Sequence, residues 1–222
     1  MESQFLAPGD TAPAFALPAV NREGQVSLDD YRGRSPVLIA MFRGLHCPFC
    51  RRQLAQLGTT QDKLKAMGVE TMAVVNTPLE HARLYFKYRP TRVLLTADPE
   101  AAIHRSYRVP AGVLVEKESE ASWAEGKLTM GQLLALQVNP TGELTAPQNP
   151  FAAMETLNKK DGFELTETDQ QIAAAHGTQM TGHFLINREG LIRWRHIEAG
   201  ERIEDLLQLP GEEEILAAAR GL

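Results

Sequence analysis

Residues 36–50 read PVLIAMFRGLHCPFC, a strand signal followed directly by a helix signal. The run 36–42 is apolar throughout and includes β-branched residues, which predicts a central strand covered on both faces. The strand ends at Arg43-Gly44-Leu45-His46, and a helical pattern begins at the two cysteines that follow. Leucines recur at near-helical spacing, and Gly68 is placed to end the helix.

The chain then continues to alternate strands and helices. Residues 69–75 predict the next strand, and Thr77-Pro78-Leu79-Glu80 offers an N-cap, a proline at the first helical position and a capping-box glutamate. The remaining predicted elements are a strand at 92–96, a helix opened by Asp98-Pro99-Glu100, a hairpin over 184–194 and a closing helix over 212–220. This order predicts an α/β fold with a largely parallel sheet.

Two parts of the chain fall outside this alternation. Residues 1–36 form an irregular, proline-containing extension with short strands and a hairpin turn at 21–24. Residues 111–180, called the insertion below, contain a charged stretch and a Pro/Asn-rich crossing over 140–150. Two helices are predicted within the insertion, one from Thr129 and one from Thr168, the second with Gln171 as capping-box partner and Gly177 as its stop. We interpret the chain as one domain, residues 1–222, with a largely helical insertion that is a lid, an interface element or a solvated decoration.

Composition excludes several classes of function. A chain of 222 residues suits one elaborated domain, and the formal charge of −5 provides no basic field for nucleic acid or an anionic membrane. No apolar run approaches the roughly 20 residues that span a bilayer. The first five residues lack the charged and apolar regions of a secretory signal, so we expect a cytoplasmic protein if the chain is complete.

Cys47 and Cys50 are the chain's two cysteines, and their spacing indicates redox chemistry. Cysteines at i and i+3 in the first helical turn lie on one face, roughly 5–6 Å apart at Cα, within reach of a disulfide. The first cysteine caps the helix, where unpaired N–H groups and the positive dipole end favour a thiolate. Pro48 fixes the backbone at a position that needs no N–H donor.

Four basic side chains lie close to this motif in the sequence, namely Arg43, His46, Arg51 and Arg52. We expect their charge to lower the pKa of the Cys47 thiol further. The thiolate is the nucleophile in disulfide exchange, and the second cysteine then releases the partner from the mixed disulfide. His46 has a second interpretation as an ordinary solvent-facing loop histidine, and for His183 a packed or exposed strand position without function is favoured.

Two other interpretations of the cysteines stay open. His46, Cys47 and Cys50 could supply three metal ligands, although a structural zinc site takes four, usually from two separated pairs. The chain would then be a metal-binding or partner-binding module that uses these residues and the insertion. The other interpretation is a pair of inert thiols on a scaffold that has changed function.

Three stretches resemble the alkyl hydroperoxide reductase/thiol-specific antioxidant (AhpC/TSA) family, the peroxiredoxin-like branch of the thioredoxin superfamily. They are Gly9-Asp10-Thr11-Ala12-Pro13-Ala14-Phe15-Ala16-Leu17, Val26-Ser27-Leu28-Asp29-Asp30-Tyr31-Arg32-Gly33 and Gly182-His183-Phe184-Leu185-Ile186-Asn187-Arg188-Glu189-Gly190. The resemblance covers most of residues 9–110 and 182–200. It implies a thioredoxin-like fold, with a central mixed sheet flanked by helices and extra N-terminal strands.

The peroxide-binding signature of that family is absent. Peroxiredoxins carry Pro-x-x-x-Thr/Ser-x-x-Cys, which on this chain would place Cys50 as the peroxidatic residue, Cys47 at the hydroxyl position and Arg43 at the proline. Taking Cys47 as peroxidatic places Gly44 and Ala40 at those two positions instead. The family's distant arginine corresponds to Thr181, and the cis-proline of thioredoxins corresponds to Gly182. Cys-Pro-Phe-Cys itself resembles the glutaredoxin motif.

The sequence therefore predicts a thiol–disulfide oxidoreductase in which Cys47 attacks, Cys50 resolves and Arg43 stabilises the thiolate. His46, Pro48, Phe49, Thr181 and Gly182 are the predicted substrate-binding residues. We expect a thioredoxin- or glutathione-type reductant, a disulfide or hydroperoxide substrate, and no cofactor. A peroxiredoxin-like peroxidase with Cys47 peroxidatic and Cys50 resolving is the nearest alternative. A homodimer is kept as an open alternative to a monomer.

Overall fold

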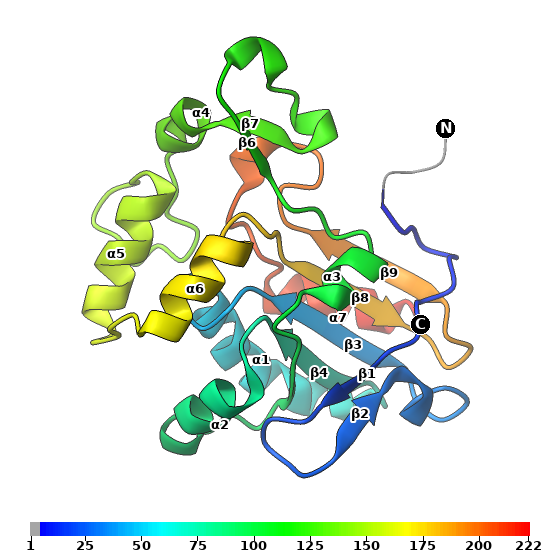
Figure 1. Ribbon diagram of the computed structural model, residues 1–222. Coiled ribbons are helices and arrows are strands. Elements are labelled where there is room, and N and C mark those ends of the chain that lie inside the picture. The colour runs from blue at the N-terminus through cyan, green and yellow to red at the C-terminus, as the bar shows by residue number, and fades with distance from the viewer. Residues whose placement is uncertain (1–4) are drawn as a thin grey trace.

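The computed structural model describes residues 5–222 and is built around a five-stranded mixed sheet (Figure 1). The strand order is β5 (Leu94–Ala97), β4 (Glu70–Val75), β3 (Val37–Phe42), β8 (Gly182–Ile186) and β9 (Ile192–Ile197). β3 pairs in parallel with β4 and antiparallel with β8, and β8 pairs antiparallel with β9. The sheet is therefore mixed, as the family resemblance implies, and not largely parallel as the alternation alone predicted.

The predicted central strand is confirmed, because every residue of β3 is buried between two pairing partners. α1 (Pro48–Ala66) follows it and packs against α7 (Glu212–Arg220) behind the sheet in the view of Figure 1. On the other face, α3 (Ala102–Ser106) leads to Tyr107, whose ring packs edge-on against Phe184 of β8 at 5.0 Å. The N-terminal strands β1 (Ala16–Pro18) and β2 (Gln25–Ser27) form a small hairpin, as expected.

Helix ends test the capping predictions one by one. Gly68 follows α1 with φ +76°, a left-handed conformation that glycine adopts without strain, so the predicted stop is confirmed. The cap predicted for α2 (Leu79–Tyr88) is wrong, because the N-cap is Pro78 and no side chain caps the helix. Thr77 instead accepts a hydrogen bond from the Leu45 amide through its hydroxyl, at 3.2 Å, and so supports the loop before the cysteines.

The insertion adds no strand to the main sheet. It contains a two-stranded parallel pair, β6 (Val113–Val115) and β7 (Lys127–Thr129), followed by α4 (Met130–Ala135), α5 (Pro150–Lys160) and α6 (Glu167–His176). The helix predicted after Thr129 is confirmed as α4, with Thr129 as its N-cap.

Two predictions inside the insertion need correction. α6 is capped by Thr166 with Asp169 as capping-box partner, two residues before the cap predicted at Thr168 and Gln171, while Gly177 follows its last turn as expected. Asp169, the capping-box partner of Thr166, is buried and also lies 3.2 Å from His81, a tertiary contact that no local pattern marks. α5 was not predicted at all, although Asn149 caps it and Pro150 opens it.

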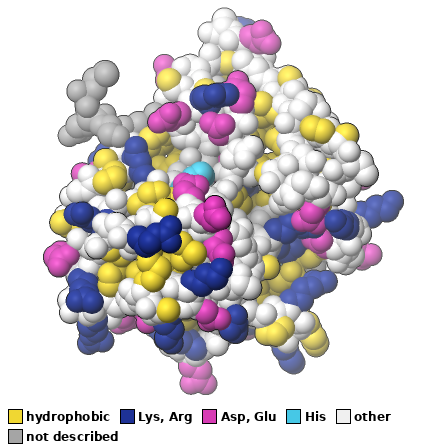
Figure 2. All heavy atoms as spheres, turned by 180° about the vertical axis from the view of Figure 1, so that it is seen from behind, with side chains coloured by type: hydrophobic (Ala, Val, Ile, Leu, Met, Phe, Trp, Pro, Cys, Tyr) yellow, Lys and Arg dark blue, Asp and Glu magenta, His cyan; other side chains and the backbone are white. Residues whose placement is uncertain are grey.

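The surface carries charges of both signs. In the view of Figure 2, basic and acidic side chains are interspersed across the face, with apolar side chains between them. Among residues 5–222, no helix is long and apolar enough to cross a membrane. Residues 1–4, which entered the expectation of a cytoplasmic protein, lie outside the described part of the chain.

Two histidines lie inside the fold without charge. His183 on β8 packs edge-on against Phe42 at 5.5 Å and against His196 at 6.2 Å, which confirms packing as its environment. Burial lowers the pKa of His183 to about 3, with a smaller contribution from His196. Burial and the nearby Arg43 also lower the pKa of His104 on α3 to about 3. Both side chains are therefore neutral throughout the pH range in which the unfolded chain would protonate them.

These histidines predict acid sensitivity. Because their folded pKa values lie below the ordinary value near 6.5, the unfolded chain binds the extra protons, and the free energy of unfolding falls as pH drops from about 6.5 towards about 3. Each contributes on the order of 1 kcal/mol per pH unit to this loss. Urea unfolding of the oxidised protein gives the free energy of unfolding at each pH between 7 and 5, where carboxylates contribute little. This free energy should fall less steeply with decreasing pH for His183→Gln than for the wild type. Equal slopes would contradict the prediction.

Candidate active site

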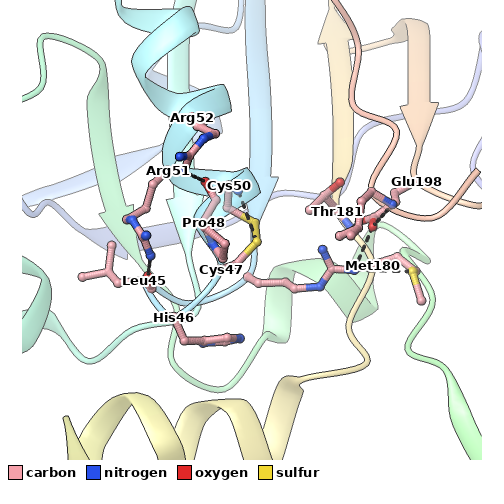
Figure 3. Close-up of a disulfide and its surroundings, with 12 residues drawn as sticks. Leu45, His46, Cys47, Pro48, Cys50, Arg51, Arg52, Met180, Thr181 and Glu198 are labelled. Atoms are coloured by element: carbon pink, nitrogen blue, oxygen red, sulfur yellow. Dashed lines mark hydrogen bonds and ion pairs between the residues drawn. A yellow bond between two sulfur atoms is a disulfide. The ribbon is translucent and has the colours of Figure 1, made fainter. Parts of the chain in front are cut away.

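The two cysteines form a disulfide at the first turn of α1 (Figure 3). Cys47 is the N-cap, Pro48 is the first helical residue, and the Cα atoms of Cys47 and Cys50 are 5.4 Å apart. The Cys50 amide donates a hydrogen bond to Cys47 Sγ at 3.2 Å. An unpaired N–H of the helix terminus is thus aimed at the sulfur that was predicted to attack, where it would stabilise a thiolate.

The disulfide and the loop before it are buried. Cys47 is 0% exposed and Cys50 is 4% exposed, and every residue from 41 to 50 is classed as buried. The insertion contributes to this cover. An added Cβ at Gly44 would lie 2.7 Å from the Ile172 side chain of α6, and Asn158 of α5 donates to the His46 carbonyl at 3.4 Å.

Arg43 points its charge at a carboxylate. Its guanidinium lies 2.8 Å from Glu198 Oε1, and both side chains are nearly excluded from solvent. Glu198 also accepts hydrogen bonds from the amides of Thr181 and Leu207, at 2.9 and 2.8 Å. In Figure 3, Met180, Thr181 and Glu198 lie together on one side of the disulfide. The positive charge of Arg43 is therefore largely compensated within this buried group.

The two arginines after the motif are compensated as well. Arg51 contacts Asp161 at 2.6 Å, and Arg52 contacts the same carboxylate at 2.8 Å and Glu143 on its other side. Hydrogen bonds from Arg52 and Lys160 lower the pKa of Glu143 to about 2. Although burial opposes it, the hydrogen bonds from both arginines hold the pKa of Asp161 below its ordinary value. Both acids are charged at neutral pH.

His46 is not a cation at neutral pH. Burial, together with the nearby Arg43, lowers its pKa to about 4, and its Nδ1 atom has no hydrogen-bond partner. In Figure 3 its ring lies beside the pale-yellow helix, α6. The three arginines near the motif are thus paired with carboxylates, and His46 is neutral. The helix-terminal amide adds to the support of a thiolate at Cys47, and stabilisation by the nearby side-chain charge stays a prediction.

The predicted substrate-binding residues occupy different environments. Pro48 and Phe49 are buried in the first turn of α1 beside the cysteines. Thr181 joins the Glu198 group through its amide, while its hydroxyl has no hydrogen-bond partner. Gly182 lies in β8, where an added Cβ would approach Val109 to 2.6 Å, so close packing accounts for this glycine. A role for these residues in binding substrate stays a prediction.

Sequence reasoning missed the residues that surround the motif from a distance. Glu198 lies 155 positions after its partner Arg43, and Asp161 lies 110 positions after Arg51. No local pattern marks either acid, because each meets its arginine only through tertiary contact. Among residues 5–222, no group of three or more His, Cys, Asp or Glu side chains is arranged to hold a metal ion.

Comparison with known proteins identifies relatives. A sequence profile described as the AhpC/TSA family matches residues 8–125, more than half of the chain. No curated protein matches the sequence significantly. Peroxidoxin BcpB from Mycobacterium tuberculosis superposes with a TM-score of 0.57 at 12% identity, covering 98% of each chain. Reduced 2-Cys peroxiredoxin from Plasmodium vivax gives 0.58 at 14%, covering 96% of this chain and 94% of its own.

A further similar structure comes from Chlorobium tepidum and is assigned as a thiol:disulfide interchange protein, DsbE. It has a TM-score of 0.52 at 21% identity and covers 96% of this chain and 99% of its own. At these identities the three structures establish the shared thioredoxin-like fold.

The buried ion pair predicts a strong energetic coupling. Glu198→Gln leaves the Arg43 charge buried without a counter-charge and should lower the free energy of unfolding by about 3 kcal/mol. The double variant Arg43→Met/Glu198→Gln removes both charges and should lose less than the sum of the two single variants. Urea unfolding of the four proteins measures the coupling, and additive losses would contradict it.

Proposed function

Because the chain belongs to the AhpC/TSA family, we propose that it is a thiol–disulfide oxidoreductase that cycles between a Cys47/Cys50 dithiol and the intramolecular disulfide. One observation supports this above all. The two cysteines are already paired in the first turn of α1, and a helix-terminal amide donates to Cys47 Sγ. That arrangement suits a pair that opens and closes repeatedly, since both redox states fit the same helical turn.

Each half-reaction uses the two sulfurs in turn. With a disulfide substrate, the Cys47 thiolate attacks one sulfur of RSSR, releases RS⁻ and forms a mixed disulfide. Cys50, on losing its proton, then attacks Cys47 Sγ, releases the second RS⁻ and closes the disulfide. Two thiols from the reductant reverse the process and become a disulfide themselves. Arg43, held in place by Glu198, is the residue predicted to stabilise the Cys47 thiolate in this scheme.

Membership of the AhpC/TSA family favours a second candidate, a hydroperoxide reductase at the same pair. Here the Cys47 thiolate attacks the terminal oxygen of ROOH, the O–O bond breaks and ROH leaves. Cys50 then displaces water from the Cys47 sulfenic acid and closes the same disulfide. Against this candidate stands the absence of the family's Thr/Ser and proline from the positions before the cysteine.

Single cysteine variants should separate the two roles. Cys47→Ser should abolish reaction with an aromatic disulfide, while Cys50→Ser should complete the first attack and accumulate a mixed disulfide, since no second thiol resolves it. Intact-mass measurement after acid quenching identifies the adduct, and free-thiol titration counts the groups consumed. An adduct on Cys50 in the Cys47→Ser protein, formed at the wild-type rate, would reverse the assignment.

A stopped-flow experiment that mixes the reduced protein with hydrogen peroxide or with the aromatic disulfide decides between the candidates. For a disulfide oxidoreductase, we expect peroxide to oxidise the reduced protein at about the rate of an ordinary thiol of similar pKa, while exchange with the aromatic disulfide is fast. Peroxide oxidation that is orders of magnitude faster, and that is lost in Cys47→Ser, would establish the peroxidase instead. Slow reaction with both oxidants would contradict both candidates.

A further inference from the structure

Side chains next to the cysteines hold the insertion against the active-site loop. Arg51 directly follows Cys50, and its guanidinium makes several contacts at once. It donates to the Leu45 carbonyl at 2.7 Å, to Asn158 Oδ1 at 2.8 Å and to Asp161 Oδ2 at 2.6 Å. Its guanidinium carbon also lies 4.1 Å from the centre of the Phe163 ring. One side chain thus joins the active-site loop, the end of α5 and the segment after α5.

Arg52 repeats the connection one residue later. It donates to both oxygens of Asp161, at 2.9 and 2.8 Å, and it pairs with Glu143 in the segment before α5. Asp161 therefore receives both arginines, while its side chain is 26% exposed. Charge-assisted hydrogen bonds of this kind are stronger than neutral ones, and a partly buried site screens them less than open water does.

We propose that the insertion, held on the first turn of α1 by Asp161, restricts the Cys47–Cys50 pair to small-molecule thiols and oxidants and excludes protein-sized ones. Asp161 is the specificity-determining residue of this restriction. The proposal rests on the redox function proposed above and narrows its reductant to the low-molecular-weight, glutathione-like class.

The physical argument is one of access. Exchange requires the incoming sulfur to reach one of the two cysteine sulfurs, and these residues are 0% and 4% exposed. A small thiol needs only a local opening of side chains around the loop. A protein thiol must bring a whole surface to the pair, which requires α5 and α6 to leave the loop that they contact through Asn158 and Ile172. That larger opening breaks the arginine contacts, and therefore it is the rarer event.

The test compares two reductants on the oxidised full-length protein. Dithiothreitol is the small dithiol and reduced thioredoxin is the protein dithiol, and both donate two hydrogens and become disulfides. Alkylation after acid quenching and intact-mass measurement give the rate of disulfide loss. For the wild type we expect thioredoxin to react no faster than dithiothreitol, although its activated thiolate makes it the faster reagent towards an open disulfide.

Asp161→Asn should raise the ratio of the thioredoxin rate to the dithiothreitol rate by at least about tenfold, because it weakens hydrogen bonds to both arginines. The dithiothreitol rate itself should change by less than about twofold, since the small reagent does not need the larger opening. Glu155→Gln is the matched control, because Glu155 is an exposed residue of α5. The substitution removes one negative charge and leaves the Asp161 contacts with both arginines in place. Its ratio should equal that of the wild type.

Asn158→Ala gives a second, charge-neutral opening of the same contact and should change the ratio in the same direction, with folding of each variant checked by circular dichroism. A wild type that thioredoxin reduces much faster than dithiothreitol would overturn the proposal. So would an unchanged ratio in both variants, or an equal rise of both rates. If no small reagent cycles the pair, the proposed redox function itself fails, whereas efficient cycling by both reagents defeats only the size restriction.

Discussion

Burial of the loop before α1 is the constraint on which the rest of the site depends. Gly44, Leu45 and His46 connect the central strand to the helix that carries the cysteines, and the whole segment is excluded from water. A buried loop must satisfy its polar groups from inside the protein. The Leu45 amide donates to the Thr77 hydroxyl, and Arg51 donates to the Leu45 carbonyl. Asn158 of α5 donates to the carbonyl of His46. The insertion thus supplies one of the hydrogen bonds that the buried loop requires.

Charge in this region is organised by the same constraint. A basic side chain inside a low-dielectric environment is costly unless a carboxylate accompanies it. Arg43 pairs with Glu198, which directly follows β9. The two arginines of α1 pair with Asp161 and Glu143 of the insertion. His46 resolves the same cost by remaining neutral, with a pKa lowered to about 4. The three arginines near the cysteines therefore connect segments that are distant in the sequence.

The cysteine motif lies on a fold that this chain shares with other thiol proteins. The AhpC/TSA profile covers the N-terminal strands, the central strand and the cysteine helix, and the solved structures of peroxiredoxins and of a thiol:disulfide interchange protein share this arrangement. A fold of this kind supports several thiol reactions, and residues around the helix terminus distinguish between them. In this chain two cysteines lie there, and residues 111–180 contact the loop before them and the two arginines after them.

Local sequence patterns predicted the central strand, the cysteine helix with its stop at Gly68, the hairpin of β8 and β9 and the closing helix α7. They could do so because apolar runs and helix signals act over a few neighbouring residues. The sequence also placed the two cysteines in one turn. Tertiary contacts set the antiparallel pairing of β8 with β3, the contacts of α5 and α6 with the loop before α1, and the pairing of Glu198 and Asp161 with arginines. Those partners lie more than a hundred positions away from the residues they contact, and burial and charge pairing at that range leave no local pattern in the sequence.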